Sequence, residues 1–479
     1  MNYSMIRYII ASVLKLEGVF LLIPCGIALY HGESSARAFI IVMALSLGLG
    51  ILFSLKRPVN DTIYAREGFL SVSLCWVLLS VVGALPYLIS GEITSIPDAL
   101  FESVSGFSTT GGSILSDVTA LSKATLFWRS LTHWIGGMGV LVLILTVLPM
   151  VGGQHIYLMR AETPGPSVRK LVPRVKHTAR ILYGIYIGMT LIEIIILFFS
   201  GMSAFDSVSI AISTAGTGGF GTLNDSMGSY PEHLQIIVTV FMLLFGINFN
   251  IYYLLLCKRF KQVFKSEELF AYLGIIAISI LLVAYNIRDF FPTVQEAIQQ
   301  SAFQVASIIT STGYFTTDYG QWPAFAQAIL ILLMFIGACA GSTSGGIKVS
   351  RFLIAFKTIR KELFFIIHPK SIKKVKMDGH VIARDTIRSV NIFFLTYMAI
   401  FVISLLCISL DNFDFTTNFT AVASSMNNMG PGLGLVGPTG NFSIYSDFSK
   451  AVLMFDMLVG RLEIFPILIL FMPNTWKRQ

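Results

Sequence analysis

Ten stretches of this sequence are apolar over a length that crosses a lipid bilayer, and they constrain the fold more than any other feature. The hydrocarbon core of a membrane requires about 20 predominantly apolar residues per helix. Windows near this length lie at residues 8–30, 38–55, 69–90, 125–150, 181–200, 234–257, 269–287, 324–365, 390–410 and 450–472. Only 13% of the residues are charged, whereas about a quarter are charged in a soluble domain. The sequence therefore predicts an all-α, polytopic membrane protein with about ten transmembrane helices in a lipid bilayer.

One window, 324–365, is interrupted by a run of small residues. A helix exposed to lipid does not tolerate such a break, because the freed backbone groups find no water there. The spacing of Gly341 and Gly346 suggests a phosphate-binding loop, but the lysine is displaced to Lys348 and no soluble strand precedes the run. We therefore expect a broken helix whose flexible segment is a movable constriction, or gate, in a pore. The gate residues are Gly337, Gly341, Gly345, Gly346 and Lys348.

Basic residues gather in alternate loops, which predicts the orientation of the chain. Lys and Arg are concentrated in residues 56–66, 160–180, 258–265, 351–388 and 477–478. By the positive-inside rule these loops and both termini are cytoplasmic, and this topology accounts for the net charge of +8 without a nucleic-acid partner. The opposite loops hold acidic residues such as Asp98, Asp117, Glu296 and Asp414. These acids either form an outer vestibule that concentrates cations or are simply neutral with respect to topology.

Four segments between consecutive spans share one pattern, a short apolar run that ends in small and hydroxyl residues around a glycine. The aligned glycines are Gly111, Gly218, Gly313 and Gly430, and they recur about every hundred residues. This spacing predicts four repeats of helix, re-entrant pore loop and helix around a central pore, preceded by an N-terminal helix pair. The predicted units are residues 1–66 for the pair and 67–150, 177–260, 267–366 (with the broken helix) and 384–479 for the repeats.

The chemistry of these loops fits a dehydrated alkali ion, above all K⁺. Such an ion gives up its water only to several oxygen dipoles, and backbone carbonyls suit it. Glycine lets the backbone adopt the required conformation and approach a ligand closely. The predicted filter residues are Thr109, Thr110, Gly111, Thr217, Gly218, Ser311, Thr312, Gly313, Asn428, Met429 and Gly430. The hydroxyls of Thr109, Thr217 and Ser311 either add ligands or bond to their own backbone.

A second interpretation of the four segments is close helix packing rather than a pore. Small residues also let membrane helices pack closely, but four segments in register favour a pore.

The five cysteines and seven histidines show no metal-ligand spacing, and no nucleophile motif occurs. We expect no enzymatic activity and no cofactor in this chain, with K⁺ as the transported substrate.

A charged residue within a membrane span is rare, and we take one in the last span as a candidate functional residue. Arg461 lies there, close to Asp456 and Glu463. In a cation pore Arg461 would lie below the filter and repel ions or bond to the gate. Alternatively, it pairs with one of the two carboxylates and fixes helix packing.

These segments together resemble the Trk/Ktr potassium-transporter superfamily over essentially the whole chain. The resemblance rests on the four filter segments, the run Ala340–Arg351, the run Asn427–Gly432 and the pair Gly460–Arg461. The additional N-terminal helix pair is similar to the TrkH type rather than to the shorter Ktr type.

The resemblance implies a K⁺-translocating subunit of a bacterial inner membrane, a homodimer gated by a cytoplasmic, nucleotide-binding regulator of the TrkA type. By position, it implies that the four aligned glycines form the filter, that residues 337–347 form an intramembrane gating loop, and that Arg461 controls conduction. The alternative function is a secondary transporter of a small solute coupled to Na⁺ or H⁺, with the broken span as its binding site.

Overall fold

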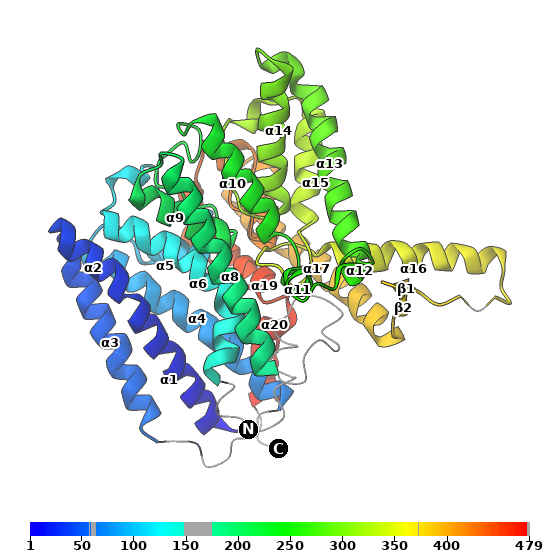
Figure 1. Ribbon diagram of the computed structural model, residues 1–479. Helices are drawn as coiled ribbons and strands as arrows, with labels where there is room; N and C mark the ends of the chain where they lie inside the picture. The colour runs from blue at the N-terminus through cyan, green and yellow to red at the C-terminus, as the bar shows by residue number, and fades with distance from the viewer. Residues whose placement is uncertain (57, 59–63, 148–174, 372, 477–479) are drawn as a thin grey trace.

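A computed structural model describes residues 1–56, 58, 64–147, 175–371 and 373–476 of the chain, and Figure 1 shows them as a bundle of helices. The predicted basic residues Arg160, Arg169, Lys170 and Arg174, together with Arg57, Lys477 and Arg478, lie outside the described residues. So does the end of the window 125–150. Within the described part the fold is all-α, apart from a two-stranded hairpin, as the sequence predicts.

Three helices precede the first repeat. They are α1 (Tyr3–Phe20), α2 (Leu22–His31) and α3 (Ala36–Ser54). α1 and α3 pack closely because Gly18 and Gly50 leave room between them, where a Cβ added to Gly18 would lie 2.7 Å from the Leu47 side chain.

Each predicted repeat contains a long helix, a shorter helix, a loop and a second helix or pair of helices. In the first and second repeats these elements are α4 (Ala65–Ser90), α5 (Ile96–Phe107), η1 (Val118–Ala120), α6 (Lys123–Val147), α8 (Val175–Phe199), α9 (Ala204–Gly216), α10 (Glu232–Phe245), α11 (Phe249–Leu256) and α12 (Phe260–Val263). In the third and fourth they are α13 (Glu267–Ile287), η3 (Arg288–Phe290), α14 (Val294–Ile309), η4 (Tyr319–Gln321), α15 (Ala324–Phe335), α16 (Val349–Ile367), α17 (Arg384–Ile408), η5 (Ser409–Asp411), α18 (Phe415–Asn427), η6 (Gly434–Val436), η7 (Phe442–Ile444), α19 (Asp447–Arg461), α20 (Phe465–Phe471) and α21 (Pro473–Trp476).

Six helical segments of the described residues are long and apolar enough to cross a membrane. They are Tyr3–His31, Ala36–Ser54, Arg66–Ser90, Arg180–Phe199, Glu267–Phe290 and Arg384–Asp411. The count of ten spans stays a prediction, because three of the other windows do not form single straight helices. The window 324–365 is broken between α15 and α16, as expected, while 450–472 also breaks, between α19 and α20.

The window 234–257 is bent as well, by 89° between α10 and α11. Backbone hydrogen bonds join the break at Gly246 to the break in the third repeat. The Cys339 amide donates to the Gly246 carbonyl at 3.1 Å, and the Phe249 amide donates to the Gly341 carbonyl at 3.0 Å. Two irregular segments at membrane depth are therefore stable because each supplies the hydrogen bonds that lipid does not.

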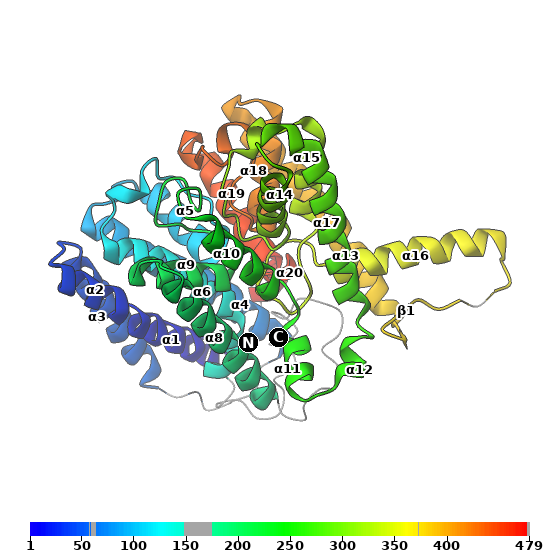
Figure 2. The same cartoon turned by 45° about the horizontal axis from the view of Figure 1, so that its top comes forward.

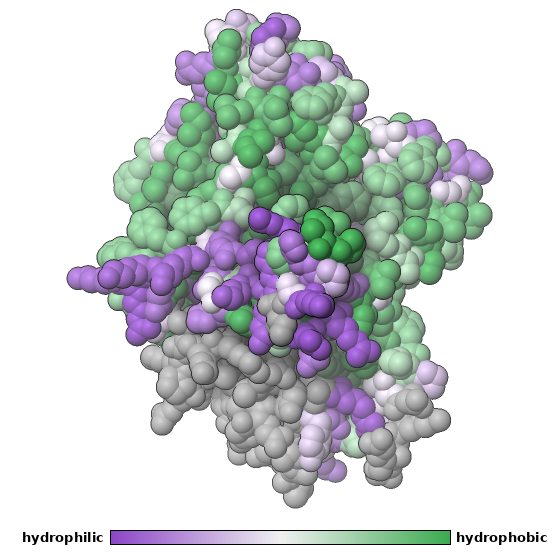
Figure 3. Space-filling view, turned by 90° about the vertical axis from the view of Figure 1, so that its right-hand side faces the viewer, coloured by the Kyte–Doolittle hydropathy of each residue, from purple (hydrophilic) through white to green (hydrophobic). Residues whose placement is uncertain are grey.

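The surface of the bundle is suited to lipid. Seen from the side of α16, a broad hydrophobic area covers the upper part of the molecule, above a belt of hydrophilic residues (Figure 3). Exposed apolar side chains of α13, α15 and α17 include Leu281, Leu332, Leu395 and Leu406. Below them, α16 extends away from the bundle (Figures 1 and 2), and the hairpin of β1 (Lys376–Met377) and β2 (His380–Val381) follows it.

Candidate functional site

The four shorter helices α5, α9, α14 and α18 lead into loops with the same backbone conformation. We call the residues 109–111, 217–219, 311–313 and 428–430 loops one to four. Each loop begins with a non-glycine residue in the left-handed region, namely Thr109, Thr217, Ser311 and Asn428, with φ between 52° and 56°. Two residues later a glycine has positive φ, namely Gly111, Gly219, Gly313 and Gly430. Conformations that are costly outside glycine therefore recur at one position in all four repeats.

This register differs by one residue from the predicted alignment in the second repeat. The equivalent of Gly111 is Gly219, and Gly218 corresponds to Thr110. A hydrogen bond confirms the register, because the middle amide of every loop donates to the carbonyl of a serine five residues earlier. These bonds are Thr110 to Ser105 (2.9 Å), Gly218 to Ser213 (3.1 Å), Thr312 to Ser307 (2.8 Å) and Met429 to Ser424 (3.0 Å). Because Gly218 and Gly219 are adjacent, the sequence does not show which of them is equivalent to Gly111. The backbone conformation shows that it is Gly219.

The loops contact one another in a closed cycle. A Cβ added to Gly111 would lie 1.9 Å from the carbonyl oxygen of Gly218, and one on Gly219 would lie 2.0 Å from that of Thr312. A Cβ on Gly313 would lie 2.2 Å from the Met429 oxygen, and one on Gly430 would lie 2.9 Å from the Thr110 oxygen. Each glycine therefore allows the next repeat's carbonyl to approach, from loop one through loops two, three and four back to loop one.

The helices that carry the loops favour a cation at this ring. Ser203, Thr293 and Asp414 cap the N-terminal ends of α9, α14 and α18 with side-chain oxygens, so the C-terminal ends of these helices meet the loops. The C-terminal end of a helix carries a partial negative charge and stabilises cations. All of the predicted loop residues with side chains are buried, which strengthens this interaction by excluding water.

The loop hydroxyls differ in their bonding. The Thr217 hydroxyl donates to the Gly216 carbonyl at 2.6 Å, and the Ser311 hydroxyl accepts from the Gly345 amide at 2.6 Å. The buried Thr109 hydroxyl has no hydrogen-bond partner among the described residues. Of the three hydroxyls in question, Thr109 is thus the one whose oxygen is not engaged by the protein.

The predicted gate lies directly against the loops. A Cβ on Gly345 would lie 2.4 Å from the Asn427 carbonyl oxygen, and Gly337 is held by a hydrogen bond from its amide to the Ile347 carbonyl at 2.9 Å. The Lys348 ammonium bonds back to the segment's own carbonyls, those of Ser344 and, at 3.1 Å, Gly345. The segment is therefore compact and places a buried lysine beside loops three and four.

Arg461 joins this segment to the first repeat. Its guanidinium donates to the carbonyl of Thr343 at 2.8 Å and to that of Gly136 in α6 at 2.7 Å. The two carboxylates considered as its structural partners are engaged elsewhere. Asp456 accepts from the Ser404 hydroxyl at 2.7 Å, and Glu463 pairs with Arg351.

The chain reverses sharply just after Arg461. Ile464 has φ 73° and ψ −65°, a conformation that is strained for a β-branched residue. The Phe465 amide donates to the Glu463 carbonyl at 2.9 Å across this turn. Strain of this kind persists only where the surroundings fix the backbone, and here it ends α19 at the arginine.

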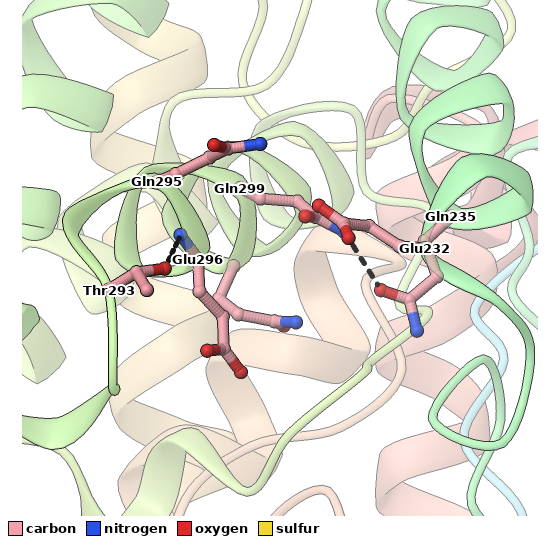
Figure 4. Close-up of a pocket in the computed structure, with 7 residues that line it drawn as sticks. Glu232, Gln235, Thr293, Gln295, Glu296 and Gln299 are labelled. Atoms are coloured by element: carbon pink, nitrogen blue, oxygen red, sulfur yellow. Dashed lines mark hydrogen bonds between the residues drawn. The ribbon is translucent and has the colours of Figure 1, made fainter.

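The face that carries the N-terminal ends of α10 and α14 is polar and acidic. A cavity of about 380 Å³ opens between the N-terminal ends of α10 and α14, and its polar side chains are drawn in Figure 4. The lining residues are Glu232, Gln235, Thr293, Gln295, Glu296, Gln299 and Gln300. Hydrogen bonds from Thr119 and Asn224 lower the pKa of Asp117, and bonds from Thr417 lower that of Asp414. These carboxyl groups are therefore ionised at neutral pH and add negative charge to the surface around them.

Sequence reasoning missed the serines that close each loop turn and the buried pair Glu102–Arg129. The serine precedes the left-handed glycine by six residues in every repeat, so this recurrence could have been recognised from the sequence. Nothing in the sequence marks Glu102 and Arg129 as partners, because they lie on separate helices.

Comparisons with known proteins agree with this arrangement. The family model of TrkH, described as cation transport protein, matches residues 31–478. The chain is 35% identical to the Trk system potassium uptake protein TrkH of Salmonella typhimurium, with all of both chains covered. It is 34% identical to the Trk system potassium uptake protein TrkG of Escherichia coli, again over all of both chains.

A solved structure has the same fold. The crystal structure of the potassium transporter TrkH from Vibrio parahaemolyticus matches with a TM-score of 0.88 and 33% identity, and the match covers all of both chains. The similarity thus extends over the N-terminal helices, all four loops, the gate segment and Arg461. The chain belongs to the TrkH family of cation transport proteins.

Proposed function

We propose that this chain takes up K⁺ across the inner membrane of a bacterium, through a filter made by loops one to four. The observation that carries the proposal is the closed cycle of four loops, each at a helix C-terminal end and each with a glycine against the next loop's carbonyl. The relatives named above as potassium uptake proteins support the choice of ion. Carbonyl oxygens replace the hydration shell of K⁺, and the acidic outer face raises the local cation concentration.

The membrane potential is sufficient to drive this uptake. Moving one positive charge inward is favoured by about 2.3 kcal/mol per 100 mV. No hydrolysis by this subunit is then needed for accumulation. With both termini at the cytoplasmic side, loops one to four lie toward the outside and the gate below them.

The gate is residues 337–347 together with Lys348 and Arg461. The hydrogen bonds of Arg461 to Thr343 and Gly136 hold the segment closed, and opening requires that they be broken. A cytoplasmic, nucleotide-binding regulator would supply the energy for opening by docking on the basic cytoplasmic surface, which includes Lys258, Arg259 and Lys261.

Uptake of ⁸⁶Rb⁺ into proteoliposomes that contain only this chain tests the proposal. We expect uptake that is blocked by K⁺ and only weakly by Na⁺ or Li⁺. Liposomes without protein and liposomes with heat-denatured protein are the controls. Uptake of an organic solute driven by a Na⁺ or H⁺ gradient, without Rb⁺ flux, would instead establish the secondary transporter.

The active form is proposed to be a homodimer that pairs through α16. Phe356, Ile359, Leu363 and Ile366 of this helix are 58–76% exposed and follow one another at helical spacing, so they form one apolar row. The helix extends away from its own bundle (Figure 1), and the described residues of its own chain leave the row exposed. A second copy of the chain fits such a surface.

The dimer can be measured directly by light scattering in detergent. We expect wild-type protein at twice the chain mass of 52.8 kDa, and the double variant Phe356→Glu, Ile359→Glu at the mass of one chain, because two charges in an apolar interface are costly. Lys361→Glu, on the other side of α16, should remain dimeric. A dimeric double variant would exclude this helix from the interface.

A further inference from the structure

A buried ion pair lies behind loop one. Glu102 of α5 and Arg129 of α6 are 0% and 2% exposed, and the Arg129 Nε lies 2.7 Å from the Glu102 Oε1. Glu102 also accepts from the Ser113 hydroxyl at 3.1 Å and from the Ile114 amide at 3.2 Å. Arg129 donates to the same Ser113 hydroxyl at 3.3 Å. The pair therefore holds the segment that leaves loop one, two and three residues after Gly111.

The four repeats differ at the position of Glu102, nine residues before the left-handed glycine. The equivalents are Ile210, Gln304 and Ala421. Gln304 makes a neutral contact to the same position of its own repeat, with its side-chain amide donating to the Thr316 hydroxyl at 3.3 Å, and Thr316 corresponds to Ile114. Opposite loops one and three are thus braced by polar contacts, whereas the second and fourth repeats have apolar side chains there. Only loop one, among these described positions, has a charged brace.

Arg129 also contacts the residue that follows loop two. Its guanidinium carbon lies 4.0 Å from the centroid of the Phe220 ring, and Phe220 directly follows Gly219. The imidazole of His133, one helical turn after Arg129, stacks on the same ring at 4.2 Å. Cations bind the face of an aromatic ring most strongly where water is excluded, and Phe220 is only 2% exposed.

The contact continues from Phe220 to the third repeat. The hydroxyl of Tyr314, the residue after Gly313, donates to the carbonyl of Ile210 at 3.2 Å and to that of Phe220 at 3.5 Å. One arginine thereby connects the segment after loop one with the residue after loop two, and Tyr314 extends the connection to loop three. If either Glu102 or Arg129 were replaced by a neutral residue, the other would remain as an uncompensated buried charge. The contacts that make up this connection therefore depend on one another.

We propose that Arg129, held by Glu102 and seated on Phe220, is a positioning residue that fixes the spacing of loops one and two and thereby sets the preference for K⁺ over Na⁺. This inference rests on the proposed K⁺ filter. Ions of different size require different spacings of the carbonyl oxygens, and a ring whose loops are held rigidly distinguishes them best. Glu102 keeps the guanidinium in place, and the flat guanidinium fits the ring face in a way that lysine does not.

Competition experiments in proteoliposomes test this role. The readout is the ratio of the Na⁺ and K⁺ concentrations that halve ⁸⁶Rb⁺ uptake, in protein whose folding is checked by gel filtration and by its thermal unfolding midpoint. We expect the ratio to fall about tenfold in Arg129→Gln and Glu102→Gln, the scale of one lost charge-assisted hydrogen bond. Phe220→Leu should show the same loss, and Phe220→Tyr, which keeps the ring, should retain the wild-type ratio.

A matched control uses a different arginine, which lies over a tyrosine ring. Arg288 lies 4.6 Å from the Tyr285 centroid and is half exposed, so Arg288→Gln should keep the wild-type ratio. Folded Arg129→Gln and Phe220→Leu proteins with the wild-type ratio would overturn the positioning role, even if their uptake is slower. If Arg129→Gln does not fold, the two Phe220 variants decide. A wild-type protein that takes up Rb⁺ without preferring K⁺ would overturn the proposed filter itself, which is a different result.

Discussion

Replacing Gly111 by Ala is expected to abolish K⁺-selective uptake. The new Cβ would lie 1.9 Å from the carbonyl oxygen of Gly218, and neither group is the flexible end of a side chain. In addition, φ at this residue is 78°, a conformation that costs an alanine about 1–2 kcal/mol. The backbone of loop one must therefore move away from loop two, which opens the ring. The measurement is ⁸⁶Rb⁺ uptake with K⁺ and Na⁺ competition, at equal amounts of folded protein.

Two further glycines give this experiment its controls. Gly219→Ala should have the same effect, since its Cβ would lie 2.0 Å from the Thr312 oxygen. Gly201 has φ 96° but open space around its Cβ position, so Gly201→Ala should cost stability of the same order as the φ penalty and leave selectivity unchanged. Selective uptake by Gly111→Ala at wild-type rates would show that loop one is not part of the filter.

Replacing Arg461 by Ala is expected to raise ⁸⁶Rb⁺ flux through the chain alone by at least about tenfold. The substitution removes two hydrogen bonds that hold residue 343 and α6 together, and bonds from a charged donor contribute about 1.5–3 kcal/mol each. A tenfold change in an equilibrium requires about 1.4 kcal/mol, so the closed state loses much of its advantage. The substitution also removes a positive charge from the proposed path of the cation.

Two variants separate the bonding of Arg461 from its charge. Arg461→Lys keeps the charge but lacks the fork that reaches two carbonyls, so we expect flux between those of the wild type and the alanine variant. Arg288→Ala, at an exposed arginine, should change nothing. Flux that stays level or falls in folded Arg461→Ala protein would argue against a gate at this residue.

Features with a short-range signature in the sequence were predictable. The all-α membrane class follows from apolar length, and the break in the window 324–365 follows from its glycines. The bend between α10 and α11 was not predictable, because a single Gly246 in an apolar run does not reveal that the amide of Cys339, almost a hundred residues later, donates to its free carbonyl. The break after Arg461 was likewise hidden, since Ile464 is an ordinary helix residue by composition and only the packing around it imposes its positive φ.

The site shows the same limit. The hydroxyl and glycine residues of the loops stand out by repetition, yet the adjacent Gly218 and Gly219 are equivalent until the backbone conformation separates them. The sequence left two kinds of partner open for Arg461, the gate segment and the nearby carboxylates of Asp456 and Glu463, and the fold selects the first, with a hydrogen bond to Thr343. In the fold its partners are backbone carbonyls, and carbonyls carry no sequence signal at all.

The cycle of loops is built from one polypeptide, and this has a consequence for how such a protein varies. In an assembly of four identical chains, every substitution is repeated four times around the axis, so any change in the ring is large and symmetric. Here a substitution changes the residues of a single quadrant, and the remaining three keep their own residues. Asn428 and Thr109 therefore coexist at equivalent positions, and each quadrant of the ring can change its residues separately.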